Sequence, residues 1–282
     1  MSKLLELMKT EKLFFDGAMG TLLIEYPEYS GKEPALLNLT HPEIITDIHK
    51  KYVDIGCNLI TTNTFDVNPE KYENYAEIVR AAIANARAAI DDKEDCFVGL
   101  DIGPIGKLMY PMGLLKPEEA YDLFKAMVIA GNDADFIIIE TMIDENETRE
   151  ALRAAKENSH LPVFVSNAYN QRGRLLTTGA RPADVVAIAE EFGADAIGAN
   201  CSFGPDKMLP IIEAFKEATD LPVFANPNAG LPEIVDGKPT YNVTPEEFVG
   251  HMRGIANLGV TMLGGCCGTT PEYIGLLIQE LK

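Results

Sequence analysis

Two adjacent cysteines, Cys266 and Cys267, lie in a glycine-rich segment, Leu-Gly-Gly-Cys-Cys-Gly-Thr-Thr, that covers residues 263–270. Side chains of neighbouring strand residues point to opposite faces, so both thiols can serve one site only if the backbone turns there. Glycine permits such a turn because it has no Cβ atom. A third cysteine, Cys201, ends an apolar run earlier in the chain. Three protein ligands and one open position are typical of a catalytic zinc site, and sulfur ligands favour zinc over magnesium or manganese.

Zinc held by three thiolates would be electron-rich and suited to the capture of a fourth thiol. A free thiol has a pKa of about 8.5, so only a small fraction is ionised at neutral pH. Coordination to zinc removes the thiol proton, and the surrounding negative charge keeps the bound sulfur nucleophilic. The zinc interpretation therefore predicts alkyl transfer to a thiol.

The same glycine-rich segment has a second interpretation as a phosphate-binding loop. Its glycines and the pair Thr269-Thr270 come directly before a predicted helix, whose N-terminus would attract an anion. Glycine-rich loops after the last two strands of an α/β barrel often bind phosphate. From the spacing of these residues, zinc and phosphate are equally good predictions.

Eight short apolar runs alternate with eight amphipathic stretches along the chain. The runs cover residues 12–16, 58–63, 96–101, 135–140, 162–167, 196–201, 222–226 and 260–266. The stretches with helical spacing cover residues 41–54, 76–90, 116–129, 146–156, 182–192, 205–218, 244–258 and 270–281. Nearly continuous apolar runs are typical of parallel strands that are buried on both faces.

This alternation predicts the α/β class and a single (β/α)8 TIM barrel, with one domain over residues 1–282. The alternative is a doubly wound open sheet, which usually carries a glycine-rich nucleotide loop after an early strand. The segment Asp-Gly-Ala-Met-Gly at residues 16–20 lacks the GxGxxG spacing of that loop. We find no linker or low-complexity segment that would divide the chain.

A polar or reactive residue ends each predicted strand, and in a parallel barrel all eight ends meet at one mouth. These residues are Asp16, Asn63, Asp101, Glu140, Asn167, Cys201, Asn226 and Cys266. Strands end where polar loops begin, so one or two polar residues at strand ends would not indicate a functional site. Because every strand ends in this way, the pattern favours a functional site at the mouth.

The other cysteines and the histidines are predicted to lie away from this mouth. Cys57 precedes one predicted strand and Cys96 begins the next, so both belong to the opposite end of the barrel and are expected to pack in the core. The histidines fall in predicted helices or loops, where we expect surface or packing roles. They are His41, His49, His160 and His251.

The charge of the chain excludes several classes of function. There are 43 acidic and 24 basic residues, a formal net charge of -19, so we expect no binding to nucleic acid or to anionic membranes. Charged residues interrupt each apolar run at the N-terminus, and no run approaches the roughly 18 residues needed to span a bilayer. We therefore expect a cytoplasmic protein whose five cysteines stay reduced.

Seven segments occur in an order that resembles the homocysteine-binding module of the homocysteine S-methyltransferase family, in particular the N-terminal module of cobalamin-dependent methionine synthase. They cover residues 16–21, 59–65, 101–104, 139–141, 198–202, 226–230 and 264–272. The most specific are Asn-Cys-Ser at 200–202 and Gly-Gly-Cys-Cys-Gly-Thr at 264–269. The resemblance covers essentially the whole chain and favours zinc over phosphate.

The resemblance implies a (β/α)8 barrel and a Zn²⁺ cofactor. Its ligands, and the catalytic residues, would be Cys201, Cys266 and Cys267. The amino-acid end of homocysteine would be held by Asp16 and Glu140, and its carboxylate by the turn at Gly17 and Ala18, whose amides suit an anion. Further candidate substrate-binding residues are Asn63, Asn200 and Asn228. A further hypothesis places the oxygen of Asn228 at zinc's fourth position when the thiol is absent.

The resemblance also implies a zinc-dependent transfer of a methyl group to the thiol of homocysteine, giving methionine. The sequence ends at Lys282 without the folate and cobalamin modules of large methionine synthase. We therefore expect methylcobalamin on a separate corrinoid protein as the donor. The alternatives are a sulfonium donor (S-methylmethionine or S-adenosylmethionine), another acceptor thiol, or a non-catalytic zinc- or thiol-binding subunit of a demethylase complex.

Overall fold

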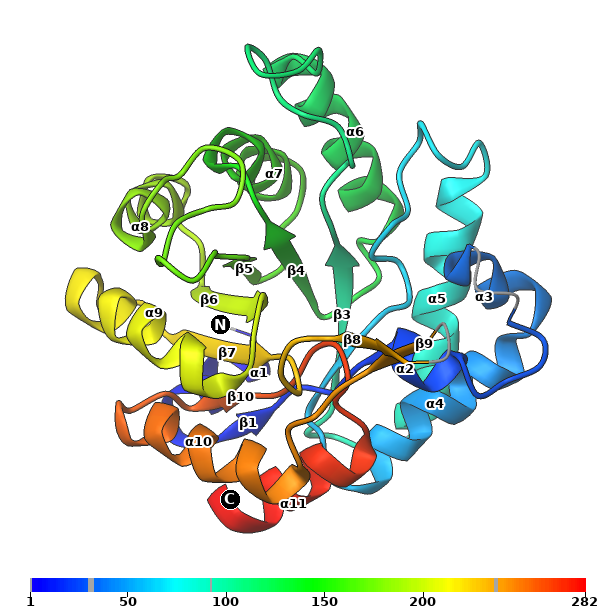
Figure 1. Cartoon of the computed structure of the whole chain (residues 1–282). Helices are drawn as coiled ribbons and strands as arrows, with labels where there is room; N and C mark the ends of the chain where they lie inside the picture. The colour runs from blue at the N-terminus through cyan, green and yellow to red at the C-terminus, as the bar shows by residue number, and fades with distance from the viewer. Residues whose placement is uncertain (1, 30–32, 92, 236–237) are drawn as a thin grey trace.

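Eight parallel strands form one sheet that curls into a nearly closed barrel, with helices around its outside (Figure 1). The computed structural model describes residues 2–29, 33–91, 93–235 and 238–282. The strands follow the order β1-β10-β7-β6-β5-β4-β3-β2, and a parallel bridge between Phe15 and Leu59 joins the two outer strands. This is a (β/α)8 TIM barrel, so the predicted fold class is confirmed and the doubly wound alternative is wrong.

The strands and the outer helices lie close to the predicted ranges. The strands of the barrel are β1 (Leu13–Phe14), β2 (Leu59–Thr61), β3 (Phe97–Ile102), β4 (Phe136–Met142), β5 (Val163–Asn167), β6 (Ala196–Cys201), β7 (Val223–Pro227) and β10 (Met262–Leu263). The outer helices are α4 (Pro42–Asp54), α5 (Tyr75–Ile90), α6 (Pro117–Ala130), α7 (Glu145–Asn158), α8 (Pro182–Phe192), α9 (Pro205–Ala218), α10 (Pro245–Asn257) and α11 (Pro271–Leu281). Regular strand structure in β10 stops before Gly264, although the amides of Gly264 and Cys266 still donate to carbonyls of β7.

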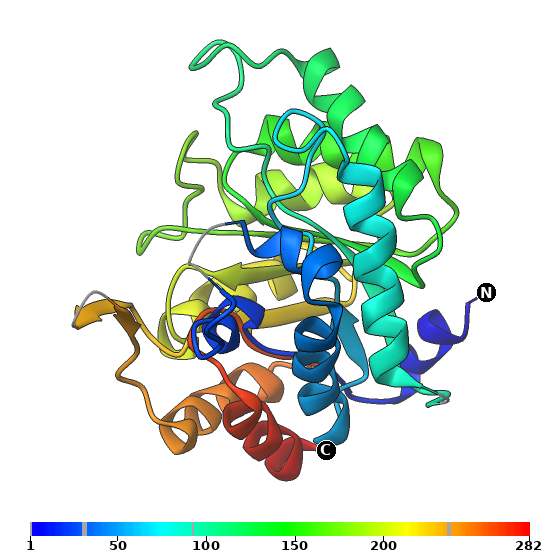
Figure 2. The same cartoon turned by 90° about the vertical axis from the view of Figure 1, so that its right-hand side faces the viewer.

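Several shorter elements were not predicted. They are α1 (Lys3–Thr10), α2 (Met19–Leu23), the 3₁₀ turn η1 (Pro34–Leu36), α3 (Leu37–Thr40), and a hairpin of β8 (Glu233–Val235) and β9 (Lys238–Thr240). Figure 2 shows α1 and this hairpin at opposite ends of the barrel. Leu4 and Met8 of α1 pack into the same cluster as the interior of the barrel, so α1 closes the end away from the hairpin.

Aromatic rings fill the interior of the barrel below the mouth. The ring centroids of Phe136 and Phe164 lie 5.0 Å apart, and those of Phe15 and Phe224 lie 5.4 Å apart. Because side chains on a strand face the same side at every second residue, polar residues two or four positions after these rings face the barrel axis. The rings therefore form an apolar floor under any site at the mouth.

Among the described residues, no helix is long and apolar enough to cross a membrane.

Candidate metal and substrate site

Three thiols from two distant segments meet at the mouth of the barrel. The sulfur atoms of Cys201 and Cys267 lie 3.9 Å apart, and those of Cys201, Cys266 and Cys267 all lie within 4.8 Å of one another. A tetrahedral zinc ion with Zn–S bonds of about 2.3 Å separates its sulfur ligands by roughly 3.8 Å. In the part of the chain that the structure describes, no other group of three His, Cys, Asp or Glu side chains is arranged to hold a metal ion.

Cys201 reaches this cluster because the backbone changes direction at the end of β6. Cys201 and Ser202 have φ values of 55° and 66°, in the left-handed region that residues with a Cβ rarely adopt. The Ser202 hydroxyl accepts a hydrogen bond from the Tyr169 amide at 2.9 Å and donates one to the Asn200 carbonyl at 3.3 Å. These bonds hold a backbone conformation that is more often found at functional sites than in ordinary strand ends.

The segment that carries Cys266 and Cys267 is fixed on both sides. The Cys266 amide donates to the Pro227 carbonyl at 2.8 Å, and the Cys267 carbonyl accepts from the Ala229 amide at 2.9 Å. Gly268 follows with a φ of 82°, and a Cβ atom there would lie 2.4 Å from the ring of Tyr241. The chain therefore turns at Gly268, as the glycine-rich sequence predicted.

The thiol cluster already favours a negative charge. Hydrogen bonds donated by the thiols of Cys201 and Cys266 lower the pKa of the Cys267 thiol to about 3. Hydrogen bonds of the Cys266 thiol with Cys201 and then with Cys267 raise the pKa of Cys266 well above its ordinary value. Cys267 is therefore the first of the three thiols to lose its proton, and a thiolate is the form of cysteine that binds a metal.

Three carboxyl groups lie at the same end of the barrel: Asp16 and Asp101 are buried, and Glu140 is partly buried. Burial raises the pKa of Asp16 to about 7. Burial, followed by the charge of Cys201, raises the pKa of Glu140 to about 8. Burial, followed by the charge of Glu140, raises the pKa of Asp101. Among the described residues, none of the three forms an ion pair with a basic side chain, so a cationic group bound at the mouth would lower these pKa values and stabilise the ionised carboxylates.

Asp16 uses its carboxylate to hold β2. Its two oxygens accept hydrogen bonds from the amide of Thr61 at 2.9 Å and from the hydroxyl of Thr61 at 3.0 Å. The adjacent turn lies against the cysteine segment, because the Ala18 amide donates to the Thr269 carbonyl at 3.0 Å. A Cβ atom at Gly17 would lie 2.8 Å from that same carbonyl, so only glycine allows this close approach. Gly17 and Ala18 are thus brought beside the segment that carries Cys266 and Cys267.

Asn200 connects the acids to the thiols. It is fully buried, and its amide nitrogen donates to Glu140 at 3.3 Å, to the Thr141 hydroxyl at 2.7 Å and to the sulfur of Cys266 at 3.9 Å. Its amide oxygen accepts from the Thr141 amide and the Ser166 hydroxyl, each at 2.8 Å. The structure therefore places Asn200 as a residue that positions Glu140.

Replacing Asn200 by alanine should lower the free energy of unfolding by about 3 kcal/mol, because several buried polar groups lose their partner at once. The matched control is Asn167→Ala. Asn167 is equally buried, but its amide nitrogen has one bond, to the Thr148 hydroxyl, so the expected loss is about 1 kcal/mol. Urea unfolding with a chelator present measures both values. Equal losses would mean that Asn200 does not connect the site.

The two other predicted asparagines have different surroundings. The side chain of Asn63 donates to the Pro34 carbonyl at 2.8 Å and so holds η1. The side-chain oxygen of Asn228 is buried and has no hydrogen-bond partner among the described residues. Asn228 directly precedes Ala229, which binds the Cys267 carbonyl. An unpartnered oxygen next to the thiol segment suits a ligand.

Not every strand-end residue faces the mouth. Asn167 is buried with its amide nitrogen on Thr148 of α7, so it lies on the helix side of β5. Ser166, which bonds to Asn200, faces the barrel in its place. The alternation of side chains along β5 would have given this result, because Phe164 faces the interior.

The remaining cysteines and histidines lie outside the thiol cluster. Cys57 and Cys96 are buried, and their thiols donate to the carbonyls of Phe15 and Cys57, each at 3.4 Å. His49 is fully buried in α4, and burial lowers its pKa to about 4. The other histidines, His41, His160 and His251, are partly or fully exposed.

Sequence reasoning missed Tyr241, which follows the hairpin of β8 and β9. Its ring packs on Gly268, and the side chain of Tyr241 helps to lower the pKa of the Cys267 thiol. Tyr241 ends no strand of the barrel and belongs to no recognisable motif. The one signal in the sequence was Gly268, because a glycine at a turn can indicate that another residue packs closely against it.

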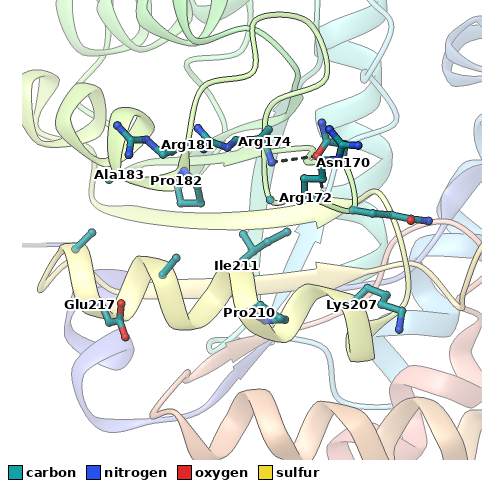
Figure 3. Close-up of a pocket in the computed structure, with 14 residues that line it drawn as sticks. Asn170, Arg172, Arg174, Arg181, Pro182, Ala183, Lys207, Pro210, Ile211 and Glu217 are labelled. Carbon is teal, nitrogen blue, oxygen red and sulfur yellow. Dashed lines mark hydrogen bonds between the residues drawn. The ribbon is translucent and has the colours of Figure 1, made fainter.

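A separate open pocket of about 600 Å³ lies between α9 and the loop that precedes α8 (Figure 3). It is lined by Arg172, Arg174, Arg181 and Lys207 together with apolar atoms such as those of Ile211. None of the predicted site residues lines it. The candidate site is therefore identified by the thiols and the acids. The pocket between α9 and α8 lies elsewhere and does not mark it.

Comparison with known proteins gives a consistent result. A model of the family described as homocysteine S-methyltransferase matches residues 13–281. The methionine synthase of Mycobacterium leprae (strain TN) is 29% identical over 96% of this chain and 24% of its own length. That of Mycobacterium tuberculosis (strain ATCC 25618 / H37Rv) is 29% identical over 96% of this chain and 25% of its own. The chain thus spans about a quarter of the length of these relatives.

Solved structures share the same barrel. The metallated form of the homocysteine methyltransferase MmuM from Escherichia coli superposes with a TM-score of 0.82 at 20% identity, and the match covers 98% of each chain. The apo form of the same protein gives a TM-score of 0.78 at 22% identity. At this level of identity the likeness is one of fold.

Proposed function

Because the chain belongs to the homocysteine S-methyltransferase family, and is an enzyme of that family, we propose that it methylates the thiol of homocysteine and releases methionine. The observation that carries the proposal is the meeting of three thiols within 4.8 Å beside buried carboxyl groups. A thiol cluster alone would suit a structural metal. The acids add a place for the amino-acid part of the substrate.

The donor set fits zinc. The sulfur atoms of Cys201, Cys266 and Cys267 have the spacing of ligands around one tetrahedral ion, and the cluster lowers the pKa of Cys267. The buried, unpartnered oxygen of Asn228 is a candidate fourth ligand when no substrate is present. Zinc bound there would supply a Lewis acid that keeps an incoming thiol in its thiolate form. We propose that these three cysteines hold it.

The other residues orient homocysteine. In the proposal, Glu140 and Asp16 attract the ammonium group. The turn at Gly17 and Ala18 receives the carboxylate, with amides other than that of Ala18, which donates to the Thr269 carbonyl. Asn200 keeps Glu140 in place through its hydrogen bond, and Asn63 supports the rim through Pro34. The phenylalanine rings beneath the mouth exclude water below the substrate, which strengthens each charged contact.

The reaction is a nucleophilic displacement at carbon. The thiol of homocysteine loses its proton to solvent, and its sulfur then forms a bond to the methyl carbon. The bond between that carbon and the donor breaks, and the donor keeps the electron pair. The chain's own residues contribute by fixing the sulfur and the amino-acid end in one orientation. This reduces the entropy that is lost when the substrate and the donor meet.

We propose methylcobalamin on a separate corrinoid protein as the methyl donor. The curated relatives that support this idea are methionine synthases, at higher identity than the E. coli methyltransferase MmuM. S-methylmethionine and S-adenosylmethionine are the alternative donors. We also propose one domain over residues 1–282 and a cytoplasmic location, where the thiols stay reduced.

Zinc-loaded protein should form methionine from homocysteine when supplied with methylcobalamin or a methylated corrinoid protein, and formation should stop after zinc is removed with a chelator. Readdition of Zn²⁺ should restore it. Mass spectrometry of methionine measures the rate, and parallel assays test the two sulfonium donors. A panel of thiols, compared by kcat/KM, identifies the acceptor. Absence of methionine with every donor would overturn the proposal.

A further inference from the structure

Asp101, at the end of β3, has a buried carboxyl oxygen without a partner. The side chain is 6% exposed, and its Oδ1 atom has no hydrogen-bond partner among the described residues. The backbone of Asp101 is well held, because its amide bonds to the Thr62 hydroxyl at 3.0 Å and its carbonyl accepts from the Thr64 hydroxyl at 2.7 Å. The residue is thus firmly positioned while its carboxyl group is left unsatisfied, an arrangement that is costly unless a ligand uses it.

The alternation of β3 places this carboxyl group toward the barrel axis. Phe97 belongs to the interior cluster, and Asp101 follows it by an even number of positions. Glu140 follows the interior residues Phe136 and Ile138 in the same way on β4, which pairs directly with β3. Asp101 and Glu140 therefore face the same space, and their charges influence each other.

The three acids of the mouth differ in how much of their hydrogen-bonding capacity is free. Both oxygens of Asp16 already accept from Thr61, so Asp16 contributes charge more than a free acceptor. Glu140 gives one oxygen to Asn200. Asp101 has a side-chain oxygen with no protein partner. A substrate ammonium group has three N–H donors and needs several acceptors at once.

We propose that Asp101 binds the ammonium group of the substrate together with Glu140, and so selects thiols that carry an α-amino group over thiols that lack one. This inference rests on the proposed function, because it assumes an amino-acid thiol at the mouth. It adds a substrate-binding residue to the predicted pair of Asp16 and Glu140. It also gives the free oxygen of Asp101 a partner.

Direct binding to zinc-loaded protein tests this role without any methyl donor. Calorimetry compares L-homocysteine with 4-mercaptobutanoate, which has the same thiol and carboxylate but no amino group. Asp101→Asn should weaken homocysteine binding by at least about tenfold, because a charge-assisted hydrogen bond becomes a neutral one. The same change should leave the affinity for 4-mercaptobutanoate and the zinc content unaltered.

The matched control is Glu147→Gln. Glu147 is another buried carboxyl group, which already accepts from the Ile105 amide at 2.8 Å, and its replacement should alter neither affinity. If Asp101→Asn weakens both thiols equally, or neither, the assignment of Asp101 is wrong. If wild-type protein fails to bind homocysteine at all, the proposed function is wrong instead.

A crystal structure of wild-type protein with zinc and homocysteine gives a second test that depends on no variant. The inference predicts about 2.7–2.9 Å between the substrate nitrogen and a carboxyl oxygen of Asp101. A substrate nitrogen placed out of hydrogen-bond reach of Asp101 would overturn it.

Discussion

Replacing Cys266 by alanine should remove the bound zinc and lower the rate of methyl transfer by at least about a thousandfold. The thiols of Cys201 and Cys267 would remain, but two ligands hold an open zinc site poorly. Loss of the metal leaves the substrate thiol mostly protonated at neutral pH. Elemental analysis gives zinc per chain, and initial rates of methionine formation give the activity.

Cys96→Ser is the matched control for this prediction. Cys96 is also a free thiol, but it is buried, donates to the Cys57 carbonyl and lies outside the cluster. Serine keeps a donor at that position, so zinc content and rate should stay close to those of the wild type. A Cys266→Ala protein that retains one zinc per chain and full turnover would contradict the ligand assignment.

Replacing Glu140 by glutamine should raise the KM for homocysteine about a hundredfold while zinc content stays the same. The amide is nearly isosteric and can still accept from Asn200, so the change removes charge and little else. Truncating a buried partner of a charged group typically costs about 2–5 kcal/mol, and a hundredfold change lies within that range. Steady-state kinetics with homocysteine and 4-mercaptobutanoate measure the effect.

Comparing the KM values of the two thiols distinguishes a loss of ammonium binding from a general disruption of the site. The KM for 4-mercaptobutanoate should change little in Glu140→Gln, because that thiol brings no ammonium group. The Glu147→Gln protein again serves as the control for loss of a buried carboxyl group. An unchanged KM for homocysteine would show that Glu140 does not contact the amino end.

The barrel could be predicted because its signal is repeated. Each buried parallel strand is an apolar run, and each outer helix begins near a proline or a polar cap. The helix α9, for example, begins at Pro205, and its predicted range matches the observed one. The hairpin of β8 and β9 has no such repetition. Its strands are short and lie outside the barrel, so burial imposes no pattern on them.

The site could be predicted in its residue types but not in its contacts. Cysteines at two strand ends are rare enough to stand out, and the TIM-barrel geometry brings them together. The connecting role of Asn200 depends on hydrogen bonds to β4 and β5, which no spacing within β6 encodes. The same holds for Asp16, whose carboxylate is engaged by Thr61 on the neighbouring strand.

The most direct test of the central claim is X-ray absorption at the zinc edge of the purified protein, with and without homocysteine. We predict about three sulfur neighbours at roughly 2.3 Å and one lighter ligand in the free protein, changing to four sulfur neighbours when homocysteine binds. A coordination shell without sulfur, or a sulfur count that homocysteine does not change, would contradict the account.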